Sequence, residues 1–346
     1  MSAPLLQVRD LATHFSTRAG IAKAVDGVSF DVAAGEIVGL VGESGSGKSV
    51  TGYSILGLVS PPGRIVAGSV KLDGQEMIGM AQAGLRSFRG RRIAMVFQDP
   101  MSTLNPVLSV AAQMRLAMLA HGKPDEAQMQ QRSIDALARV GIPDPQRRLE
   151  AYPHQLSGGM RQRVAIAIAF LNHPGLVICD EPTTALDVSI QAQILVEMKT
   201  LAREAGVGLV WISHDLATVS VLATRLLVMY AGRLIEEGAT AEVLRRPRHP
   251  YTQGLIDSLP SRASPGRDLV QIPGATPSLI HLASGCAFRE RCGYASSACG
   301  QAPGQTVDNG RTWRCHHPLT LGKSADVDSS TSAPTRAPTS SALKSP

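Results

Sequence analysis

One eight-residue stretch near the N-terminus constrains the fold of this chain more than any other feature: Gly42-Glu43-Ser44-Gly45-Ser46-Gly47-Lys48-Ser49. It matches the phosphate-binding pattern G-x-x-x-x-G-K-[ST] at every required position. The glycines allow backbone N–H groups to turn toward an anion without Cβ clashes. In this pattern the lysine reaches the β- and γ-phosphates of a nucleotide, and the Ser49 hydroxyl is placed to bind Mg²⁺.

The flanks of this loop support the same interpretation. Residues 37–41 form a short apolar run that predicts a buried strand, and residues 50–58 predict a mainly apolar helix beginning at Val50. The N-terminal dipole of that helix would face bound phosphates. A Gly/Ser-rich linker is the alternative, but a linker requires neither a strand before it nor a helix after it. The sequence therefore predicts a nucleotide site.

The rest of the chain alternates between predicted strands and helices. Residues 5–15 and 23–32 show partial alternation and predict two antiparallel strands. Further strands are expected at 68–72, 92–97, 176–179, 208–212 and 226–230, and helices at 109–122, 125–140 and 188–205. This alternation favours an α/β fold with a mainly parallel sheet.

Length and charge set wider limits. The 346 residues suffice for about two domains, and 44% hydrophobic residues allow a sizeable core. The net charge of +6 is mostly scattered, so it does not separate a nucleic-acid partner from a nucleotide, protein or lipid partner. No apolar run approaches the ~20 residues of a membrane span, and residues 1–10 do not resemble a signal peptide. We expect a cytoplasmic protein that can dock on a membrane protein.

An acidic pair follows the strand predicted at 176–179. Asp180 and Glu181 come directly after this apolar run. Such a pair is usually a solvated loop, but a chain with a phosphate-binding loop also needs a carboxylate for Mg²⁺ and a base for water. We expect Asp180 to hold Mg²⁺, usually through water, and Glu181 to act as the general base.

A second candidate phosphate-binding helix begins upstream of the acidic pair. Ser157 can cap this helix, and Gly158-Gly159 leave its first N–H groups bare. An ordinary capped helix is the alternative. Two phosphate-binding surfaces in one chain make sense if two chains sandwich the nucleotide between them.

The chain resembles the ATP-binding subunits of ABC transporters over about residues 5–250. Leu156-Ser157-Gly158-Gly159-Met160 resembles their signature motif, with Met160 where glutamine is commoner, and the motifs occur in the order of the family. The resemblance implies an α/β P-loop ABC ATPase core: a mainly parallel sheet with helices, an antiparallel β subdomain and a helical subdomain.

The resemblance also implies roles for single residues. Gln98 would contact Mg²⁺ and the attacking water, His214 would touch the γ-phosphate and support Glu181, and Asp187 would belong to the D-loop. Phe15 would stack on adenine, in place of the usual tyrosine. ATP and Mg²⁺ would bind on Lys48, Ser49, Gln98 and Asp180, while a second ATPase subunit presents its own signature loop.

The C-terminal part narrows the resemblance to di- and oligopeptide importers. The sequences at 248–252 and at Trp313-Arg314-Cys315 resemble the region that follows the ATPase core in those subunits. We expect an ATPase domain at 1–250, a small cysteine-containing subdomain at 251–322 and a disordered tail at 323–346. The implied partners are two transmembrane permease subunits, a different ATPase subunit and an extracytoplasmic solute-binding protein. The chain would then lie on the cytoplasmic face of the inner membrane.

Four of the five cysteines occur in this C-terminal part: Cys286, Cys292, Cys299 and Cys315. Disulfides are disfavoured in the cytoplasm, so the group suggests a soft metal, although the tight pairs of common zinc sites are absent. Zn²⁺, an iron–sulfur cluster or four free thiols are consistent with the spacing. The resemblance to peptide importers implies a [4Fe–4S] cluster. His316 and His317 adjoin Cys315 and could substitute as ligands, ranked below the cysteines.

Two other functions are compatible with these motifs. The same machine could carry nickel, a glycoside or another solute, or the chain could be a soluble ABC ATPase that acts on DNA or ribosomes. A single compact ATPase core and the lack of an extended basic surface argue against the second alternative, so no nucleic-acid partner is expected.

Overall fold

The computed structural model describes residues 3–184, 186–262 and 270–320, and the tail predicted at 323–346 lies outside these ranges. Within them the backbone forms a main sheet in the order β11-β12-β10-β9-β3-β8-β7-β6 and a smaller sheet in the order β2-β1-β4-β5. The strands of the main sheet are β3 (Ile37–Val41), β6 (Ile93–Val96), β7 (Leu176–Asp180), β8 (Gly208–Ser213), β9 (Arg225–Tyr230), β10 (Arg233–Ala239), β11 (Thr306–Asp308) and β12 (Arg311–Trp313). The smaller sheet contains β1 (Leu6–Thr17), β2 (Gly20–Val32), β4 (Gly63–Leu72) and β5 (Gln75–Glu76).

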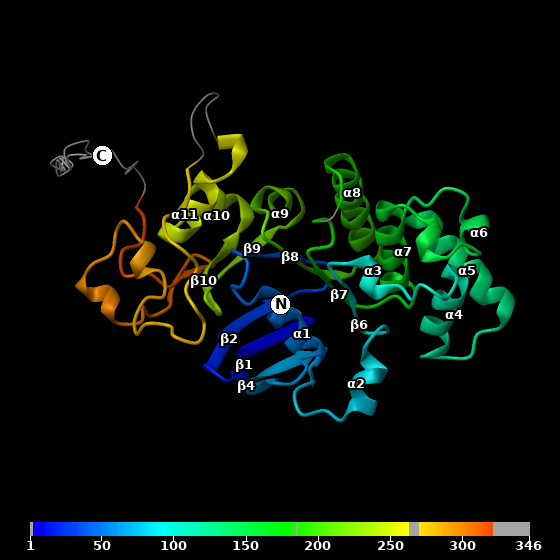
Figure 1. Cartoon of the computed structure of the whole chain (residues 1–346), viewed down its shortest axis with the longest axis horizontal. Coiled ribbons are helices and arrows are strands. Elements are labelled where there is room, and N and C mark those ends of the chain that lie inside the picture. The colour runs from blue at the N-terminus through cyan, green and yellow to red at the C-terminus, as the bar shows by residue number, and fades with distance from the viewer. Residues whose placement is uncertain (1–2, 185, 263–269, 321–346) are drawn as a thin grey trace, which may run out of the picture.

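Helices connect these strands and cover the main sheet (Figure 1). They are α1 (Lys48–Leu56), α2 (Gln82–Phe88), α3 (Pro100–Thr103), α4 (Val110–Leu119), α5 (Glu126–Arg139), α6 (Pro145–Arg148), α7 (Gly158–Phe170), α8 (Val188–Ala205), α9 (Leu216–Leu222), α10 (Thr240–Arg245) and α11 (Pro250–Asp257). Short 3-10 helices occur at Pro153–Gln155, Pro260–Arg262, Arg289–Arg291 and Ser297–Gly300.

The predicted α/β class is confirmed. Strands β9, β3, β8, β7 and β6 run parallel, whereas β1 pairs with β2 and with β4 in antiparallel register. Residues along the parallel strands alternate between two cores. On β3, Ile37 and Val41 belong to the core beneath α7, α8 and α9, and Val38 and Leu40 belong to the core shared with α1 and the smaller sheet. This alternation follows from the two-residue period of a strand.

A glycine in β3 allows a helix to pack closely on the sheet. A Cβ atom placed on Gly39 would lie 2.1 Å from Cγ1 of Val219 in α9. Any side chain at this position would push α9 away from the strand that leads into the phosphate-binding loop.

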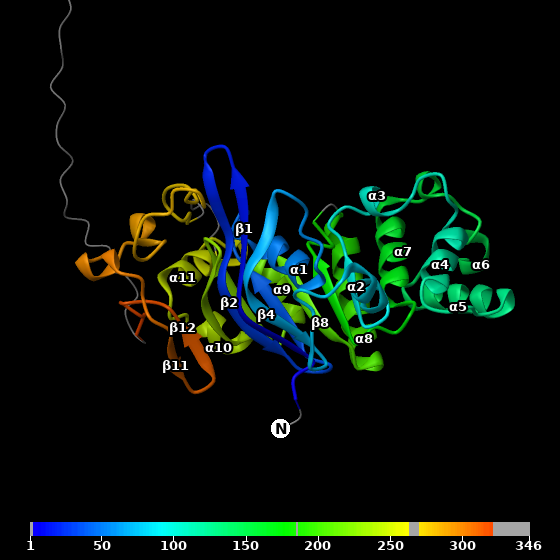
Figure 2. The same ribbon diagram turned by 90° about the horizontal axis from the view of Figure 1, so that it is seen from below.

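The helical layer and the cysteine-bearing segment occupy opposite ends of the molecule. Helices α4, α5 and α6 lie at one end of the long axis, and the chain after α11 lies at the other (Figures 1 and 2). This C-terminal segment extends the main sheet, because β12 pairs with β10 at Glu236↔Trp313 and Glu237↔Thr312. Strand β12 thus pairs with β10 across the domain boundary that the sequence predicts at residue 250. In the described part of the chain no helix combines the length and the apolarity that a membrane crossing needs.

Candidate functional site

The phosphate-binding loop connects the end of β3 to the start of α1. Gly47, the N-cap of α1, has φ +104°, and a Cβ atom there would lie 2.0 Å from the backbone oxygen of Ala24. Gly42 has φ +156°, and a Cβ atom there would lie 2.2 Å from the backbone oxygen of Met229. Both positions require glycine, so the pattern read in the sequence is explained by close backbone approaches.

The lysine of the loop is held by the loop itself. Lys48 is 4% exposed, and its Nζ donates to the backbone oxygens of Gly42, at 2.8 Å, and Glu43, at 2.9 Å. Burial lowers the pKa of Lys48, while the nearby carboxylates of Glu181, Asp180 and Glu43 oppose this effect.

Two of the three residues expected to bind Mg²⁺, Ser49 and Asp180, contact each other. Ser49 Oγ donates to Asp180 Oδ1 at 2.8 Å, across 131 residues of sequence. Burial raises the pKa of Asp180, and hydrogen bonds from Ser49 and Tyr53 oppose this shift. A hydroxyl oxygen and a carboxylate oxygen, which are the kinds of ligand that Mg²⁺ prefers, thus lie side by side.

Three side chains converge on one carboxylate oxygen of Glu181. Its Oε2 lies 3.1 Å from His214 Nδ1, 3.2 Å from Thr184 Oγ1 and 3.3 Å from Gln98 Nε2. Gln98 follows β6, Glu181 follows β7 and His214 follows β8, and these neighbouring strands are parallel. Their carboxyl ends therefore bring the three residues to one edge of the sheet. Thr184 was not expected from the sequence.

A cavity of about 780 Å³ joins the loop to this cluster. Its described lining contains the loop, Gln98, Glu181, Thr184 and His214, and also Ala24, Leu255 and Leu279. Phe15, expected at the adenine, is not in that lining, and its ring faces Gly63, where a Cβ atom would lie 2.4 Å from Phe15 Cε1. The structure thus brings Leu255 and Leu279 of the C-terminal part to the site, which sequence reasoning did not anticipate.

The expected signature residues lie at the start of α7, outside this cavity. Ser157 is the N-cap and its side chain accepts from the N–H of Met160 at 3.3 Å. Ser157 and Gly158 are exposed, while Leu156 is buried. Asp187 is the N-cap of α8, and the two helix starts pack together, because a Cβ atom on Gly159 would lie 2.9 Å from Ile190.

Glu43 of the loop is bound by two residues from the C-terminal part. Arg291 pairs with both carboxylate oxygens of Glu43, and the Glu43 N–H donates to Tyr251 Oη at 2.8 Å. Both residues lie in regions that the sequence analysis singled out: Tyr251 in the stretch 248–252, and Arg291 next to Cys292. Nothing in the sequence indicated that either would contact the loop.

The four cysteines of the C-terminal part lie near one another. The pKa of Cys315 is raised to about 11, mainly by burial and partly by the other three thiols. Among the described residues, no group of three or more His, Cys, Asp or Glu side chains is arranged to hold a metal ion. The expected iron–sulfur site is therefore not supported.

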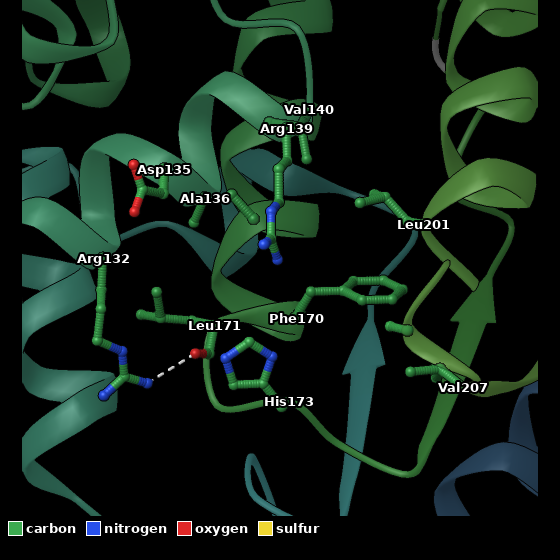
Figure 3. A pocket seen from close by; sticks show the side chains of 12 residues that line it. Arg132, Asp135, Ala136, Arg139, Val140, Phe170, Leu171, His173, Leu201 and Val207 are labelled. Atoms are coloured by element: carbon green, nitrogen blue, oxygen red, sulfur yellow. Dashed lines mark hydrogen bonds between the residues drawn. The ribbon is translucent and has the colours of Figure 1, made fainter. Parts of the chain in front are cut away.

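A second pocket, of about 120 Å³, lies between α5, α7 and α8 (Figure 3). Phe170 and Leu201 give it an apolar wall, and Arg132, whose guanidinium donates to the Leu171 backbone oxygen at 2.9 Å, lies at its rim. Its volume is a small fraction of the 780 Å³ cavity, and none of the expected site residues lines it.

Comparison with known proteins agrees with this geometry. The family model "ABC transporter" matches residues 25–184, and the model "Oligopeptide/dipeptide transporter, C-terminal region" matches residues 235–299. The chain is 44% identical over 317 residues to dipeptide transport ATP-binding protein DppD of Escherichia coli, covering 91% of this chain and 97% of that protein. It is 42% identical over 316 residues to oligopeptide transport ATP-binding protein OppD of Salmonella typhimurium, covering 91% and 94%.

A solved structure shows the same fold. The ATP-binding cassette MJ0796, a dimer in a post-hydrolysis state bound to ADP and Pi, matches with a TM-score of 0.62 and 27% identity over 68% of this chain and 98% of that chain. Identity and coverage at these levels, together with the strand-end site, show that the chain is an ATPase and belongs to the ABC transporter ATP-binding subunits of the dipeptide and oligopeptide group.

Proposed function

We propose that the chain hydrolyses ATP to drive import of dipeptides or oligopeptides, on the cytoplasmic face of the inner membrane. The observation that carries this proposal is that one chain combines the Glu181-centred ATPase site with the oligopeptide/dipeptide transporter C-terminal region at 235–299. The relatives DppD and OppD are named for dipeptide and oligopeptide transport. The nickel, glycoside and nucleic-acid alternatives have no comparable observation in their favour.

Lys48 and the start of α1 would hold the phosphates of ATP. The Lys48 ammonium group donates to the backbone oxygens of Gly42 and Glu43. When ATP binds, it would donate instead to the β- and γ-phosphate oxygens, which are charged and therefore stronger acceptors. Ser49 and Asp180 would hold Mg²⁺, with Gln98 beside them. Mg²⁺, when bound, neutralises the charge on the β- and γ-phosphate oxygens.

Glu181 would accept a proton from the water that attacks the γ-phosphate. Gln98, Thr184 and His214 orient its Oε2, so the carboxylate faces the cavity rather than rotating into solvent. Orientation of this kind is the main contribution of a protein to phosphoryl transfer, together with electrostatic stabilisation.

A second ATPase subunit, a different chain, would complete each nucleotide site. The start of α7 in this chain would then present its first N–H groups to the γ-phosphate held by the partner. The residues we assign to this partner-facing site are Leu156, Ser157, Gly158, Gly159, Met160 and the adjoining Asp187, of which Leu156 is buried. Phe15 as the adenine platform rests on the resemblance alone.

The permease partners would bind beside Gln98. A groove of about 550 Å³ lies between β6 and α4, and its lining includes Phe97, Leu104, Leu116 and Ile168. Leu116 is 57% exposed at this groove, so an apolar helix of a transmembrane subunit would cover surface that is unfavourable in water. We propose two permease subunits, with an extracytoplasmic solute-binding protein on the other side.

We also propose that the four cysteines hold a [4Fe–4S] cluster. Burial raises the pKa of the Cys286, Cys292 and Cys315 thiols, and backbone N–H groups of Phe288, Tyr294 and His317 oppose that shift, toward the thiolates that such a cluster requires. Protein purified without oxygen should be brown and contain about four iron and four sulfide per chain. One zinc per chain, without iron, would show that the cysteines form a zinc site and not an iron–sulfur cluster. Protein purified without any metal would contradict both the cluster and the zinc site.

The transport proposal is tested with the intact assembly. The chain, tagged and expressed in its native membrane, should capture two permeases and a second ATPase, and reconstituted vesicles should take up peptides when ATP is supplied. The same assembly carrying Glu181→Gln should bind ATP without uptake. Capture of nucleic acid in place of permeases, or uptake of nickel or glycosides but not peptides, would overturn the proposal.

A further inference from the structure

The loop between Cys286 and Cys292 reaches the phosphate-binding loop. Arg291 Nη1 lies 2.6 Å from Glu43 Oε2, and Arg291 Nη2 lies 2.9 Å from Glu43 Oε1, so the pair is bidentate. The two residues are 248 positions apart in sequence. Arg291 is 8% exposed and the Glu43 side chain is 26% exposed, so solvent weakens this pair less than it weakens a surface ion pair.

The surroundings of Arg291 keep its guanidinium in place. Its Nε donates to the Pro273 backbone oxygen at 2.7 Å, and its Cζ lies 5.9 Å from the ring centres of both Tyr230 and Phe288. Phe288 belongs to the same Cys286–Cys292 loop and packs edge-on against Tyr251, with ring centres 5.4 Å apart. The cysteine-bearing loop therefore contributes both the cation and part of its aromatic support.

Glu43 also has its backbone fixed from this side. Its N–H donates to the hydroxyl of Tyr251, which is 0% exposed, and its backbone oxygen accepts from Lys48 Nζ at 2.9 Å. A short series of contacts thus leads from the cysteine-bearing loop, through Arg291 and Glu43, to the phosphate-binding lysine.

The charge of Glu43 makes this contact relevant to ATP. A carboxylate inside a phosphate-binding loop repels the phosphates that the loop must attract, and Glu43 lines the 780 Å³ cavity. Arg291 compensates that charge with a buried cation. Without Arg291, the carboxylate would keep its full charge beside the nucleotide and would be free to rotate toward it.

We propose that Arg291 is a positioning residue for ATP binding. Through Arg291, the folding of the cysteine-bearing segment, the described residues from Cys286 to Cys315, would affect how tightly the phosphate-binding loop binds ATP. The proposal rests on the ATPase function of this site. It assigns to the cysteine-bearing segment a role in nucleotide binding that does not depend on which metal the cysteines hold.

The first test is a charge cycle on the full chain. Arg291→Met should weaken binding of a fluorescent ATP analogue about tenfold, within the usual range of coupling between sites. Glu43→Gln removes the carboxylate charge and keeps its shape, so the double variant Arg291→Met/Glu43→Gln should recover most of that affinity. Arg289→Met is the matched control, because Arg289 lies in the same loop but donates to the Ser284 backbone oxygen.

A purely structural role gives a different result. The double variant would then bind the analogue as weakly as Arg291→Met alone, and weak binding would follow the loss of thermal stability in every variant. Either outcome, or unchanged binding by Arg291→Met, would overturn the proposal. If Arg291→Met does not fold, Arg291→Gln replaces it, since glutamine removes the charge and keeps hydrogen-bond donors, and Glu43→Gln should again restore most of the affinity. Failure of the wild-type chain to bind ATP would instead contradict the ATPase assignment.

The second test concerns the coupling. Cys292→Ser loosens the segment next to Arg291, so it should weaken ATP binding in the wild-type background. In the Arg291→Met background it should add nothing, because the connection to Glu43 is already cut. Equal effects in the two backgrounds, or no effect in either, would show that the cysteine-bearing segment does not act through Arg291.

Discussion

Glu181 is held in one orientation by contacts from the ends of neighbouring strands. His214 Nδ1, Thr184 Oγ1 and Gln98 Nε2 all lie within 3.3 Å of its Oε2. Glu181→Gln keeps the size of the side chain and removes the basic oxygen. ATP binding should remain close to wild type, while steady-state hydrolysis should fall at least 100-fold, within the range of general-base catalysis.

Two further variants show whether the loss in Glu181→Gln is specific. Glu204→Gln changes an exposed glutamate on α8 and should hydrolyse ATP as wild type does. Lys48→Ala should lose tight ATP binding itself, since it removes the cation that faces the phosphates. Normal turnover by Glu181→Gln would remove Glu181 from the role of base.

At the scale of elements, the start of α7 makes a prediction about assembly. Ser157 is the exposed N-cap of this helix, and its hydroxyl oxygen accepts from Met160 N–H. Ser157→Arg would place a long cation where the partner's γ-phosphate should lie. ATP binding by the chain's own loop should persist, while ATP-driven association with a second subunit should fail. Light scattering with and without ATP measures this association, and normal association would contradict the two-subunit site.

The start of α11 makes a prediction about pH. Burial lowers the pKa of His249 to about 3, and its neutral Nδ1 accepts from Tyr251 N–H at 3.0 Å. The unfolded chain therefore binds a proton below about pH 6.5 that the folded chain refuses. Stability should fall as the pH drops from 6.5 toward 3, with a loss of about 2 kcal/mol between pH 7 and pH 5.

His249→Asn isolates this effect, because asparagine can still cap the helix but does not titrate. Urea unfolding at pH 7 and pH 5 should show a smaller loss in the variant than in wild type. Burial also raises the pKa of Glu236, so this carboxyl group makes the folded state more stable as the pH falls. The contribution of Glu236 is the same in wild type and in His249→Asn, so it cancels in the comparison. Equal losses in the two proteins would show that His249 is not buried in its neutral form.

At the scale of the whole molecule, a buried carboxylate ties the C-terminal segment to the main sheet. Glu236 on β10 is 1% exposed and accepts from Arg311 Nη2 at 2.8 Å and from Arg248 N–H at 2.8 Å. Arg311 lies on β12, which pairs with β10. One side chain thus holds the start of α11 and the C-terminal hairpin together.

Arg311→Met should therefore destabilise the protein by about 3 kcal/mol, because it leaves the charge of Glu236 buried without its cation. Arg314→Met is the matched control, since Arg314 bonds only to Gln305 in an exposed position among its described side-chain hydrogen bonds. Chemical denaturation of both variants measures the difference. A loss in Arg311→Met no larger than in the control would mean that Glu236 is satisfied by backbone N–H groups alone.

Local patterns predicted the elements well where one element was long or strongly periodic. The helix expected at 188–205 is α8 with the same bounds, and the antiparallel pairing of the first two strands is confirmed. The strand expected at 68–72 begins earlier, at Gly63, because Phe15 pairs with Gly63 and His14 with Arg64. The start of β4 is therefore set by its pairing with β1, and such pairing leaves no pattern in the residues of β4 itself.

The sequence by itself predicted the nucleotide site, because glycines, lysine and serine at this fixed spacing match the phosphate-binding pattern. The contacts that require glycine at Gly42 and Gly47 come from the backbone of Met229 and Ala24, in other strands. The sequence also predicted the strand ends at which Asp180 and Glu181 lie, since an apolar run followed by carboxylates has a local pattern. Only the tertiary structure decided that β12 extends the main sheet, that Leu255 and Leu279 line the cavity, and that Arg291 pairs with Glu43. These contacts join segments that lie about 75 to 250 residues apart in the sequence. Contacts between such distant segments leave no period or spacing in the sequence, because they depend on how the whole chain packs.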